Sequence, residues 1–306
     1  MSGPFAIEVN QLRKTYGKEQ LVAVDDVSFH VNKGELFGLI GPDGAGKTSI
    51  FRMLSTLLLP EKGTATVDGY DVVADYKQIR ETIGYMPGKF SLYPDLTIEE
   101  NLRFFATVFG TTIAQNYHLI EDIYVQIEPF KNRRAGKLSG GMKQKLALCC
   151  ALIHKPTVLF LDEPTTGVDP VSRKEFWEML KRLKEQNITI LVSTPYMDEA
   201  ALCDRIALIQ NGKILSINTP QNMIEQYPER LFAIKADQMY KLIKALREYP
   251  EVMDCYAFGE YAHVSFKGAL QEIKLKAYLE TKGLVQIEIK PAAPTIEDYF
   301  IKLLKN

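Results

Sequence analysis

The order of hydrophobic and polar residues in the first three quarters of the chain predicts two kinds of strand. Near the start, apolar and polar residues alternate, which is typical of short antiparallel strands with one face in water. Farther along, short runs are apolar throughout, which is typical of parallel strands buried on both faces. The alternating segments are Ala6–Val9, Val22–Val24 and Val27–Phe29, and the continuous runs are Leu36–Ile40, Val158–Leu161 and Ile188–Val192.

Helical patterns between these strands predict five helices. The second and third form a helical insert between a glycine-rich loop and the second parallel strand. Asn211-Gly212, which separates two apolar runs, predicts a β-hairpin. The predicted helices are Thr48–Leu58, Leu96–Phe109, Tyr117–Ile127, Leu138–Ile153 and Ser172–Lys184.

The pattern changes near Tyr227–Arg230, where we expect a domain boundary. Strands and helices then follow in the order β-α-β-β-α-β, and Thr295 is placed to cap a final helix. This order is the split-βαβ pattern of a small α+β domain. The predicted limits are therefore 5–226 for the first domain and 230–306 for the second.

Composition narrows the classes of partner. The 37 Lys and Arg nearly balance the 38 Asp and Glu, so no global basic field favours nucleic acid as a partner. The best apolar run of the first domain, Leu146–Ile153, is far shorter than the roughly 18–20 residues that span a bilayer. Any transport role therefore needs a separate membrane partner. The four cysteines lack metal-site spacing, and we expect buried thiols in a reducing compartment.

A glycine-rich loop, Gly41-Pro42-Asp43-Gly44-Ala45-Gly46-Lys47-Thr48, joins a predicted strand to a predicted helix. Its glycines let consecutive backbone N–H groups point at phosphate oxygens, and the start of the helix adds positive potential. Lys47 would reach the β and γ phosphates, and Thr48 would bind Mg²⁺. In this context we expect Gly41 to Ser49 to bind a nucleotide rather than form a plain glycine turn. An inward-pointing Asp43 carboxylate would weaken that binding.

Two carboxylates, Asp162 and Glu163, follow the apolar run Val158–Leu161. Ligands bind at the carboxyl edge of parallel α/β sheets, so both side chains are expected at the nucleotide. Asp162 would hold Mg²⁺, and Glu163 would polarise the attacking water as general base. The alternative is an acidic turn after a core strand, and the nearby glycine loop disfavours it.

A third motif, Leu138-Ser139-Gly140-Gly141-Met142, lies between the other two and opens a helix. Backbone N–H groups and a hydroxyl at a helix start form a second anion site. With this order of motifs, residues Ile7 to Gln226 resemble the ATP-binding cassette (ABC) superfamily. In that family the third motif, the signature segment, closes over nucleotide that the opposite subunit holds, in a head-to-tail dimer.

The resemblance implies the fold and further site residues. The implied fold is α/β: a P-loop cassette with a mixed sheet core, an antiparallel β subdomain and a helical subdomain around residues 90–150. A small α+β domain follows, similar to the tail of bacterial drug-efflux ATPases. Tyr16 would stack on adenine, and Asp169 would be the aspartate of the loop that crosses the dimer interface. Gly88 and Pro195 stand where the family has a glutamine and a histidine that sense Mg²⁺, water and the γ-phosphate.

Glycine and proline have no side-chain hydrogen-bond donor, so the chain's own site is expected to be weakened. The resemblance implies an ATPase that uses ATP and Mg²⁺ and drives export through a separate permease. We expect a cytoplasmic protein at the inner face of a bacterial membrane. We also expect it to pair with a second cassette, and a heterodimer with a different cassette is favoured over a homodimer. The rival hypothesis is a near-inactive regulatory switch that completes a partner's site. A translation or repair ABC protein and a small-molecule kinase fit less well, because the chain has neither a second cassette nor a coiled coil, and a kinase has no use for a signature helix.

Overall fold

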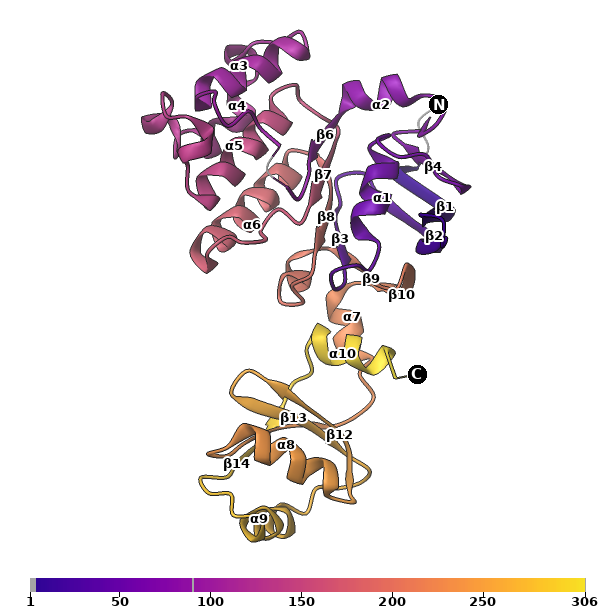
Figure 1. Cartoon of the computed structure of the whole chain (residues 1–306), viewed down its shortest axis with the longest axis vertical. Helices are drawn as coiled ribbons and strands as arrows, with labels where there is room; N and C mark the ends of the chain where they lie inside the picture. The colour runs from indigo at the N-terminus through magenta and orange to yellow at the C-terminus, as the bar shows by residue number, and fades with distance from the viewer. Residues whose placement is uncertain (1–3, 90, 306) are drawn as a thin grey trace. The chain divides into compact units, whose positions relative to one another are not determined.

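The computed structural model describes residues 4–89 and 91–305, and the chain divides into two compact units, Met1–Pro220 and Gln221–Asn306. Unit 1 and unit 2 each contain a sheet with an apolar core of its own (Figure 1). The predicted limits 5–226 and 230–306 differ from this division by a few residues and stay a prediction. Residue 306 of the second range lies outside the described residues.

The central sheet of unit 1 has six strands in the order β10-β9-β3-β8-β7-β6. Neighbours pair in parallel except β9 and β10, which form the hairpin predicted at Asn211-Gly212. The three continuous apolar runs are confirmed as strands, and every residue of β3, β7 and β8 is buried. The strands are β3 (Leu36–Ile40), β6 (Ile83–Met86), β7 (Val158–Asp162), β8 (Thr189–Thr194), β9 (Arg205–Gln210) and β10 (Lys213–Asn218).

A second, antiparallel sheet has the order β2-β1-β4-β5. The prediction of three short strands at the start of the chain was wrong, because β1 and β2 are long and irregular. Gln11 and Asp26 have left-handed backbone, with φ of 50° and 55°, and the β1–β2 register shifts repeatedly without ending the pairing. The bounds are β1 (Phe5–Tyr16), β2 (Leu21–Asn32), β4 (Lys62–Val67) and β5 (Tyr70–Asp71).

Helix α1 (Lys47–Leu54) lies between the two sheets of unit 1 (Figure 1). It ends four residues before the predicted Leu58, because Thr56 adopts a φ of 63°, which an α-helix cannot contain. The antiparallel sheet, the six-stranded sheet and α1 together bury one continuous core, whose residues run from Ala6 to Ile209. This packing fixes the start of α1 beside the carboxyl end of β3.

Helices α3 to α6 lie on the other side of the six-stranded sheet, whereas α2 packs against β5 and adds Ile79 to the core that contains α1 (Figure 1). The helical insert lies between the glycine loop and β7, as predicted, but strand β6, which precedes the insert, was missed. Helix α4 also begins earlier than the predicted Tyr117, because Thr112 and Gln115 form a capping box. The helix bounds are α2 (Tyr76–Thr82), α3 (Ile98–Val108), α4 (Ile113–Tyr124), α5 (Gly140–Leu152), α6 (Pro170–Glu185) and α7 (Pro220–Glu225). Helix α7 begins at the last residue of unit 1 and continues in unit 2. Three short 3₁₀ turns are η1 (Glu128–Phe130), η2 (Ala135–Lys137) and η3 (Glu199–Leu202).

Unit 2 is a four-stranded antiparallel sheet in the order β12-β13-β11-β14. Helices α8 and α9 pack on one face, and the order of strands and helices is the predicted split-βαβ pattern. Across all described residues, no helix combines the length and apolar character that a bilayer span requires. The bounds are β11 (Leu231–Lys235), α8 (Met239–Glu248), β12 (Val252–Phe258), β13 (Tyr261–Phe266), α9 (Glu272–Thr281), β14 (Glu288–Ala292) and α10 (Ile296–Leu303).

Candidate nucleotide-binding site

The glycine loop runs from the end of β3 to the start of α1, and two of its glycines have no room for a side chain. A Cβ atom at Gly41 would lie 2.2 Å from the Ile209 carbonyl oxygen, and one at Gly46 would lie 2.2 Å from that of Ala23. Gly46 also has a φ of 104°, which favours glycine. The Gly212 N–H of the β9–β10 hairpin donates to the Ala45 carbonyl at 3.0 Å. The loop is therefore held rigidly around the first turn of α1.

Lys47 is buried at the centre of this loop. Its Nζ donates to the carbonyl oxygens of Gly41 and Pro42 at 2.8 and 3.0 Å. The same Nζ lies 3.0 Å from Glu163 Oε1, which makes an ion pair. The loop thus presents a lysine and free N–H groups at a helix start, the chemistry that binds phosphate.

Asp162 ends β7 and is nearly inaccessible to solvent. Its Oδ1 accepts from Ser193 Oγ at 2.8 Å and from Thr48 Oγ1 at 3.2 Å. Burial raises the pKa of Asp162, although the hydrogen bonds from Ser193 and Thr48 act in the opposite direction. A buried, hydrogen-bonded carboxylate of this kind is suited to a cation.

Thr48 and Asp162 fit a magnesium ion. Both offer hard oxygen donors, and their oxygens lie 3.2 Å apart. Adjacent ligands of an octahedral Mg²⁺ with bonds of about 2.0–2.1 Å are separated by about 3 Å. Such an ion, when bound, neutralises charge on the phosphates. The remaining ligands would come from phosphate oxygens and water.

Glu163 follows Asp162 and has an unusual backbone. Its φ is 52°, a left-handed conformation that is uncommon for a residue with a side chain. Its N–H donates to the hydroxyl and the carbonyl oxygen of Ser193, at 2.9 and 3.1 Å. Strain of this kind is often found at functional sites. Ser193 was missed from the sequence, although it stands only two residues before Pro195.

The signature segment forms the start of α5. Ser139 is the N-cap residue, and its Oγ accepts from the Met142 N–H at 3.3 Å. Ser139 and Gly140 are exposed, whereas Leu138 is buried and anchors the turn. A Cβ atom at Gly140 would meet only the Gly167 carbonyl oxygen, at 3.5 Å. The anion-binding end of α5 is therefore open to solvent.

Asp169 caps the next helix and lies in the same loop as Gly167. Its carboxylate accepts from the N–H groups of Val171 and Ser172 at 3.1 and 3.0 Å. These hydrogen bonds, chiefly that from Ser172, lower the pKa of Asp169. Asp169 therefore has a structural role in α6, and its predicted role at a dimer interface stays a prediction.

Gly88 and Pro195, which stand where the family has a glutamine and a histidine, lie beside the phosphate loop and the carboxylates. A Cβ atom at Gly88 would lie 3.0 Å from the Asp162 carbonyl oxygen and 3.8 Å from Glu163 Cβ. Pro195 follows Thr194, whose carbonyl oxygen accepts from the Gly41 N–H at 3.3 Å. Neither residue brings a side-chain donor to this neighbourhood.

The expected adenine platform is the exposed ring of Tyr16, at the end of β1. Its hydroxyl lies 3.1 Å from Ser49 Oγ on α1. The ring therefore stands beside the first turn of the nucleotide helix, where a base can reach it. Asp43 is exposed on the loop. Its predicted effect on affinity stays a prediction, as do the binding roles of Tyr16 and the loop residues.

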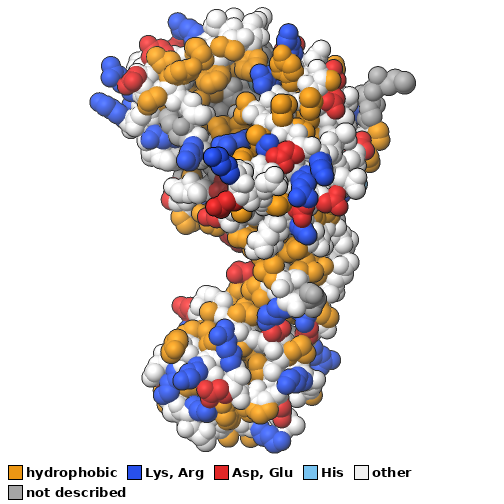
Figure 2. All heavy atoms as spheres, turned by 45° about the vertical axis from the view of Figure 1, so that its right-hand side comes forward, with side chains coloured by type: hydrophobic (Ala, Val, Ile, Leu, Met, Phe, Trp, Pro, Cys, Tyr) orange, Lys and Arg blue, Asp and Glu red, His pale blue; other side chains and the backbone are white. Residues whose placement is uncertain are grey.

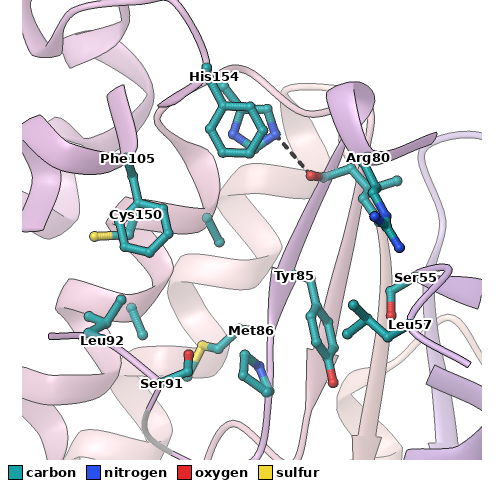
Figure 3. A pocket seen from close by; sticks show the side chains of 15 residues that line it. Ser55, Leu57, Arg80, Tyr85, Met86, Ser91, Leu92, Phe105, Cys150 and His154 are labelled. Carbon is teal, nitrogen blue, oxygen red and sulfur yellow. Dashed lines mark hydrogen bonds between the residues drawn. The ribbon is translucent and has the colours of Figure 1, made fainter. Parts of the chain in front are cut away.

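A groove of about 330 Å³ lies between the six-stranded sheet and the helices of the insert. Figure 3 shows Tyr85, Leu57 and Arg80 on one side, and Phe105, Cys150 and Leu92 on the other. His154 closes one end through a contact of 2.9 Å from Nε2 to the Ile83 carbonyl oxygen. Burial lowers the pKa of His154, although this contact acts in the opposite direction. Sequence patterns gave no sign of this groove, because its walls come from separate segments.

Comparison with known proteins identifies relatives along the whole chain. A family model described as "ABC transporter" matches residues 24–166. The probable multidrug ABC transporter ATP-binding protein YbhF of Escherichia coli is 38% identical over 304 residues, which cover 97% of this chain and 52% of YbhF. The Nod factor export ATP-binding protein I of Paraburkholderia xenovorans is 40% identical over 290 residues, covering 90% of this chain and 94% of the relative. The doxorubicin resistance ATP-binding protein DrrA of Mycobacterium tuberculosis is 41% identical over 221 residues, 71% of this chain and 67% of DrrA. The chain spans about half the length of YbhF.

Solved structures agree with this comparison. An ATP-binding subunit of an ABC transporter superimposes with a TM-score of 0.65 at 29% identity, over 72% of this chain and 93% of that structure. The dimeric structure of MJ0796, described as a bacterial ABC transporter cassette, gives a TM-score of 0.63 at 25% identity, over 70% of this chain and 98% of that structure. Both cover a share of the chain close to the size of unit 1.

Proposed function

Because the chain belongs to the ABC transporter family and is an ATP-binding cassette of that family, we propose that it binds and hydrolyses ATP to drive export through a separate permease. The family, the fold class and the enzyme class predicted from the sequence, an ATPase, are confirmed at the level of the family. The observation that carries the proposal is the convergence of Lys47, Thr48, Asp162 and Glu163 within hydrogen-bonding distance at one edge of the sheet. Export is supported by the relatives' names, which describe multidrug transport, doxorubicin resistance and Nod factor export.

In the proposed reaction, Lys47 binds the β and γ phosphates and Thr48 and Asp162 hold Mg²⁺ beside them. Glu163 accepts a proton from the water that attacks the γ-phosphate. Ser193 holds the Asp162 carboxylate and the backbone of Glu163 through its contacts with Asp162 Oδ1 and the Glu163 N–H. Two copies of the cassette arranged head to tail would let the open signature end of α5 complete a neighbour's site.

The finer proposal is that this chain's own site turns over slowly. Gly88 and Pro195 adjoin the carboxylates and the phosphate loop without providing a donor, whereas the signature segment keeps its cap and its open glycine. Removing one preorganised donor from a transition state typically costs about 10²–10³ in rate. Faster turnover would then need a second cassette that has its own donors, which gives one slow and one working site. If this chain's own site does not turn over at all, the same arrangement becomes a regulatory switch that only completes the partner's site.

The test compares steady-state ATPase activity of the purified homodimer with that of Gly88→Gln/Pro195→His. We expect a slow parent and a gain of about 10²-fold or more. Gly88→Ala/Pro195→Ala is the matched control, since it introduces the same tight Cβ beside the Asp162 carbonyl without a donor. A parent that already turns over at roughly 1–10³ s⁻¹, with no gain in the double variant, would contradict the finer proposal. Single-turnover hydrolysis by the parent separates a slow enzyme from the regulatory switch.

The groove provides the contact that we propose for the permease. One wall is the end of β6, which leads directly to Gly88, and the other is α5, which begins at the signature segment. A permease segment with an apolar face in this groove would therefore touch both elements that lead to nucleotide. On the face that Figure 2 shows, charges of both signs are interspersed with hydrophobic side chains, so this face has no single-sign field to direct docking.

Leu57→Glu tests this docking. Leu57 lines the groove and is 58% exposed, so a charge there should not disturb the core. We expect less of the chain to co-purify with its permease from membranes, with ATP affinity unchanged. Val108→Glu is the control, because Val108 is similarly exposed on α3 and does not line the groove. Equal loss in both variants would show that the groove has no special role.

A further inference from the structure

A buried carboxylate beyond the proposed catalytic residues lies at the start of η3. Glu199 is only 2% exposed, and a carboxylate is costly to bury unless donors satisfy it. Its oxygens accept from Thr194 Oγ1 at 2.5 Å, from Thr165 Oγ1 at 2.8 Å and from Arg173 Nε at 3.0 Å. We call Glu199 and these three donors the Glu199 junction.

The three donors belong to three different parts of the nucleotide site. Thr194 ends β8, and its carbonyl oxygen accepts from the Gly41 N–H of the phosphate loop. Thr165 stands two residues after the proposed general base, Glu163. Arg173 lies in the first turn of α6, and its N–H donates to the Asp169 carbonyl at 2.9 Å. The junction is therefore the point where these parts meet through side chains.

The segment between Thr194 and Glu199 is also fixed at both ends. The Tyr196 N–H donates to Thr194 Oγ1 at 3.1 Å, and the Arg173 guanidinium lies 4.1 Å from the centre of the Tyr196 ring. Arg173 Nη2 also pairs with Asp198 at 3.3 Å. Pro195, inside this segment, adds a fixed φ. A shift of the phosphate loop would therefore move the whole segment as one piece.

We propose that Glu199 is a positioning residue that couples the phosphate loop to Glu163 and to α6. It links these parts although position 195 has no side-chain donor. The inference rests on the proposed ATP-binding function of this site. When nucleotide fills the loop, Thr194 shifts with Gly41, and the Glu199 junction transmits that shift to α6 and the Asp169 loop.

The chain contains its own reporter for this coupling. Trp177 is the one tryptophan of the sequence, and it is buried one turn after Arg173 on α6. Together with Arg173, Asp198 and Glu199 it lines a cavity of about 270 Å³. Tryptophan fluorescence therefore reports on the surroundings of the junction in the unlabelled protein.

The experiment titrates the full chain with Mg-ATP, following Trp177 fluorescence, and measures affinity separately by calorimetry. The parent should bind ATP and change its fluorescence. Glu199→Gln keeps the size of the side chain and removes its charge. It should reduce the fluorescence change by about half or more, slow single-turnover hydrolysis by about 10–100-fold, and leave affinity within about threefold. Glu178→Gln is the matched control, because it makes the same change at an exposed carboxylate that lines the same cavity but lies outside the Glu199 junction, and it should change neither signal.

The outcomes separate the two proposals. No calorimetric binding by the parent overturns the proposed function, and this inference with it. Normal binding together with an unchanged fluorescence response and rate in Glu199→Gln overturns the inference alone, as does a parent whose fluorescence does not respond to bound ATP. If Glu199→Gln does not fold, Thr165→Val removes one of the three donors at similar volume, and the same reductions in signal and rate are expected.

Discussion

On the phosphate-loop side of unit 1, glycine backbone, Lys47 and Asp162 are packed into the core, while the neighbouring Gly88 and Pro195 offer no donor. On the signature side, Ser139 and Gly140 are exposed at the start of α5, and a Cβ atom at Gly140 would have no neighbour nearer than the Gly167 carbonyl oxygen at 3.5 Å. Both sides present a helix start, where anions are favoured, yet one is packed within the chain and the other is an open surface. Under the proposed function, the comparison teaches that a cassette without side-chain donors on its own side can still complete a partner's site.

The largest effect is expected from Gly140→Asp, which acts on the signature side alone. The new carboxylate has room and stands at a helix start, so folding should be unaffected. Facing a γ-phosphate, it should weaken ATP-dependent dimerisation by about 100-fold or more, since like charges across an interface cost several kcal/mol. ATP binding by the monomer should not change. Gly140→Asn, of equal size and no charge, is the control for analytical ultracentrifugation, and loss of monomer binding would disprove the division into two sides.

Lys47→Ala acts on the phosphate-loop side alone. Hydrogen bonds to charged groups are worth about 1.5–3 kcal/mol, so ATP affinity should fall roughly 10- to 150-fold. Lys33→Ala removes an exposed lysine and should have no effect in the same calorimetric titration. Equal affinity of Lys47→Ala and the parent would mean that the loop does not bind phosphate.

Tyr16→Ala should have a smaller effect on the same side. Aromatic contacts are worth about 0.5–1.5 kcal/mol, which predicts a loss of about 2- to 10-fold in ATP affinity. Tyr16→Phe keeps the ring and removes only the contact with Ser49 Oγ, so it should bind like the parent. If Phe weakens binding as much as Ala, the hydroxyl rather than the ring is the important group.

Ending the chain at Gln226 should have the smallest effect. Units 1 and 2 each bury an apolar core of their own, so the shortened protein should fold and bind ATP within about twofold of the full chain. Circular dichroism and calorimetry of both proteins check this. An insoluble product would show that residues after 226 complete the core of unit 1, and both sides of the site would then depend on them.

The elements that could be predicted were those with a local cause. The β9–β10 hairpin follows from Asn211 and Gly212, which both adopt positive φ, and the cap of α10 follows from Thr295. The long strands β1 and β2 could not be predicted, because their pairing continues past Gln11 and Asp26 despite positive φ at both residues, which the local residue pattern does not indicate. The Glu199 junction was missed for the same reason, since Thr165 and Arg173 meet Glu199 only after folding.

Some residues of the nucleotide site could be predicted from the sequence, whereas the role of Ser193 could not. Lys47, Thr48, Asp162 and Glu163 could be predicted as neighbours, because strand ends of one parallel sheet lie at one edge. The function of Ser193, which contacts the Asp162 carboxylate and the Glu163 backbone N–H, depends on the register between β7 and β8. Register follows from packing across the sheet rather than from the strand's own residues.

Lys47 already forms an ion pair with the Glu163 carboxylate. Under the proposed function, a phosphate that binds Lys47 would therefore replace this carboxylate as the lysine's partner. The lysine is paired with the carboxylate that we propose as general base, so the loop does not enclose an uncompensated charge. The other carboxylate oxygen of Glu163, Oε2, accepts from Thr166 Oγ1 at 3.4 Å. Under the proposed function, the event that delivers the substrate would therefore also release the general base from the lysine.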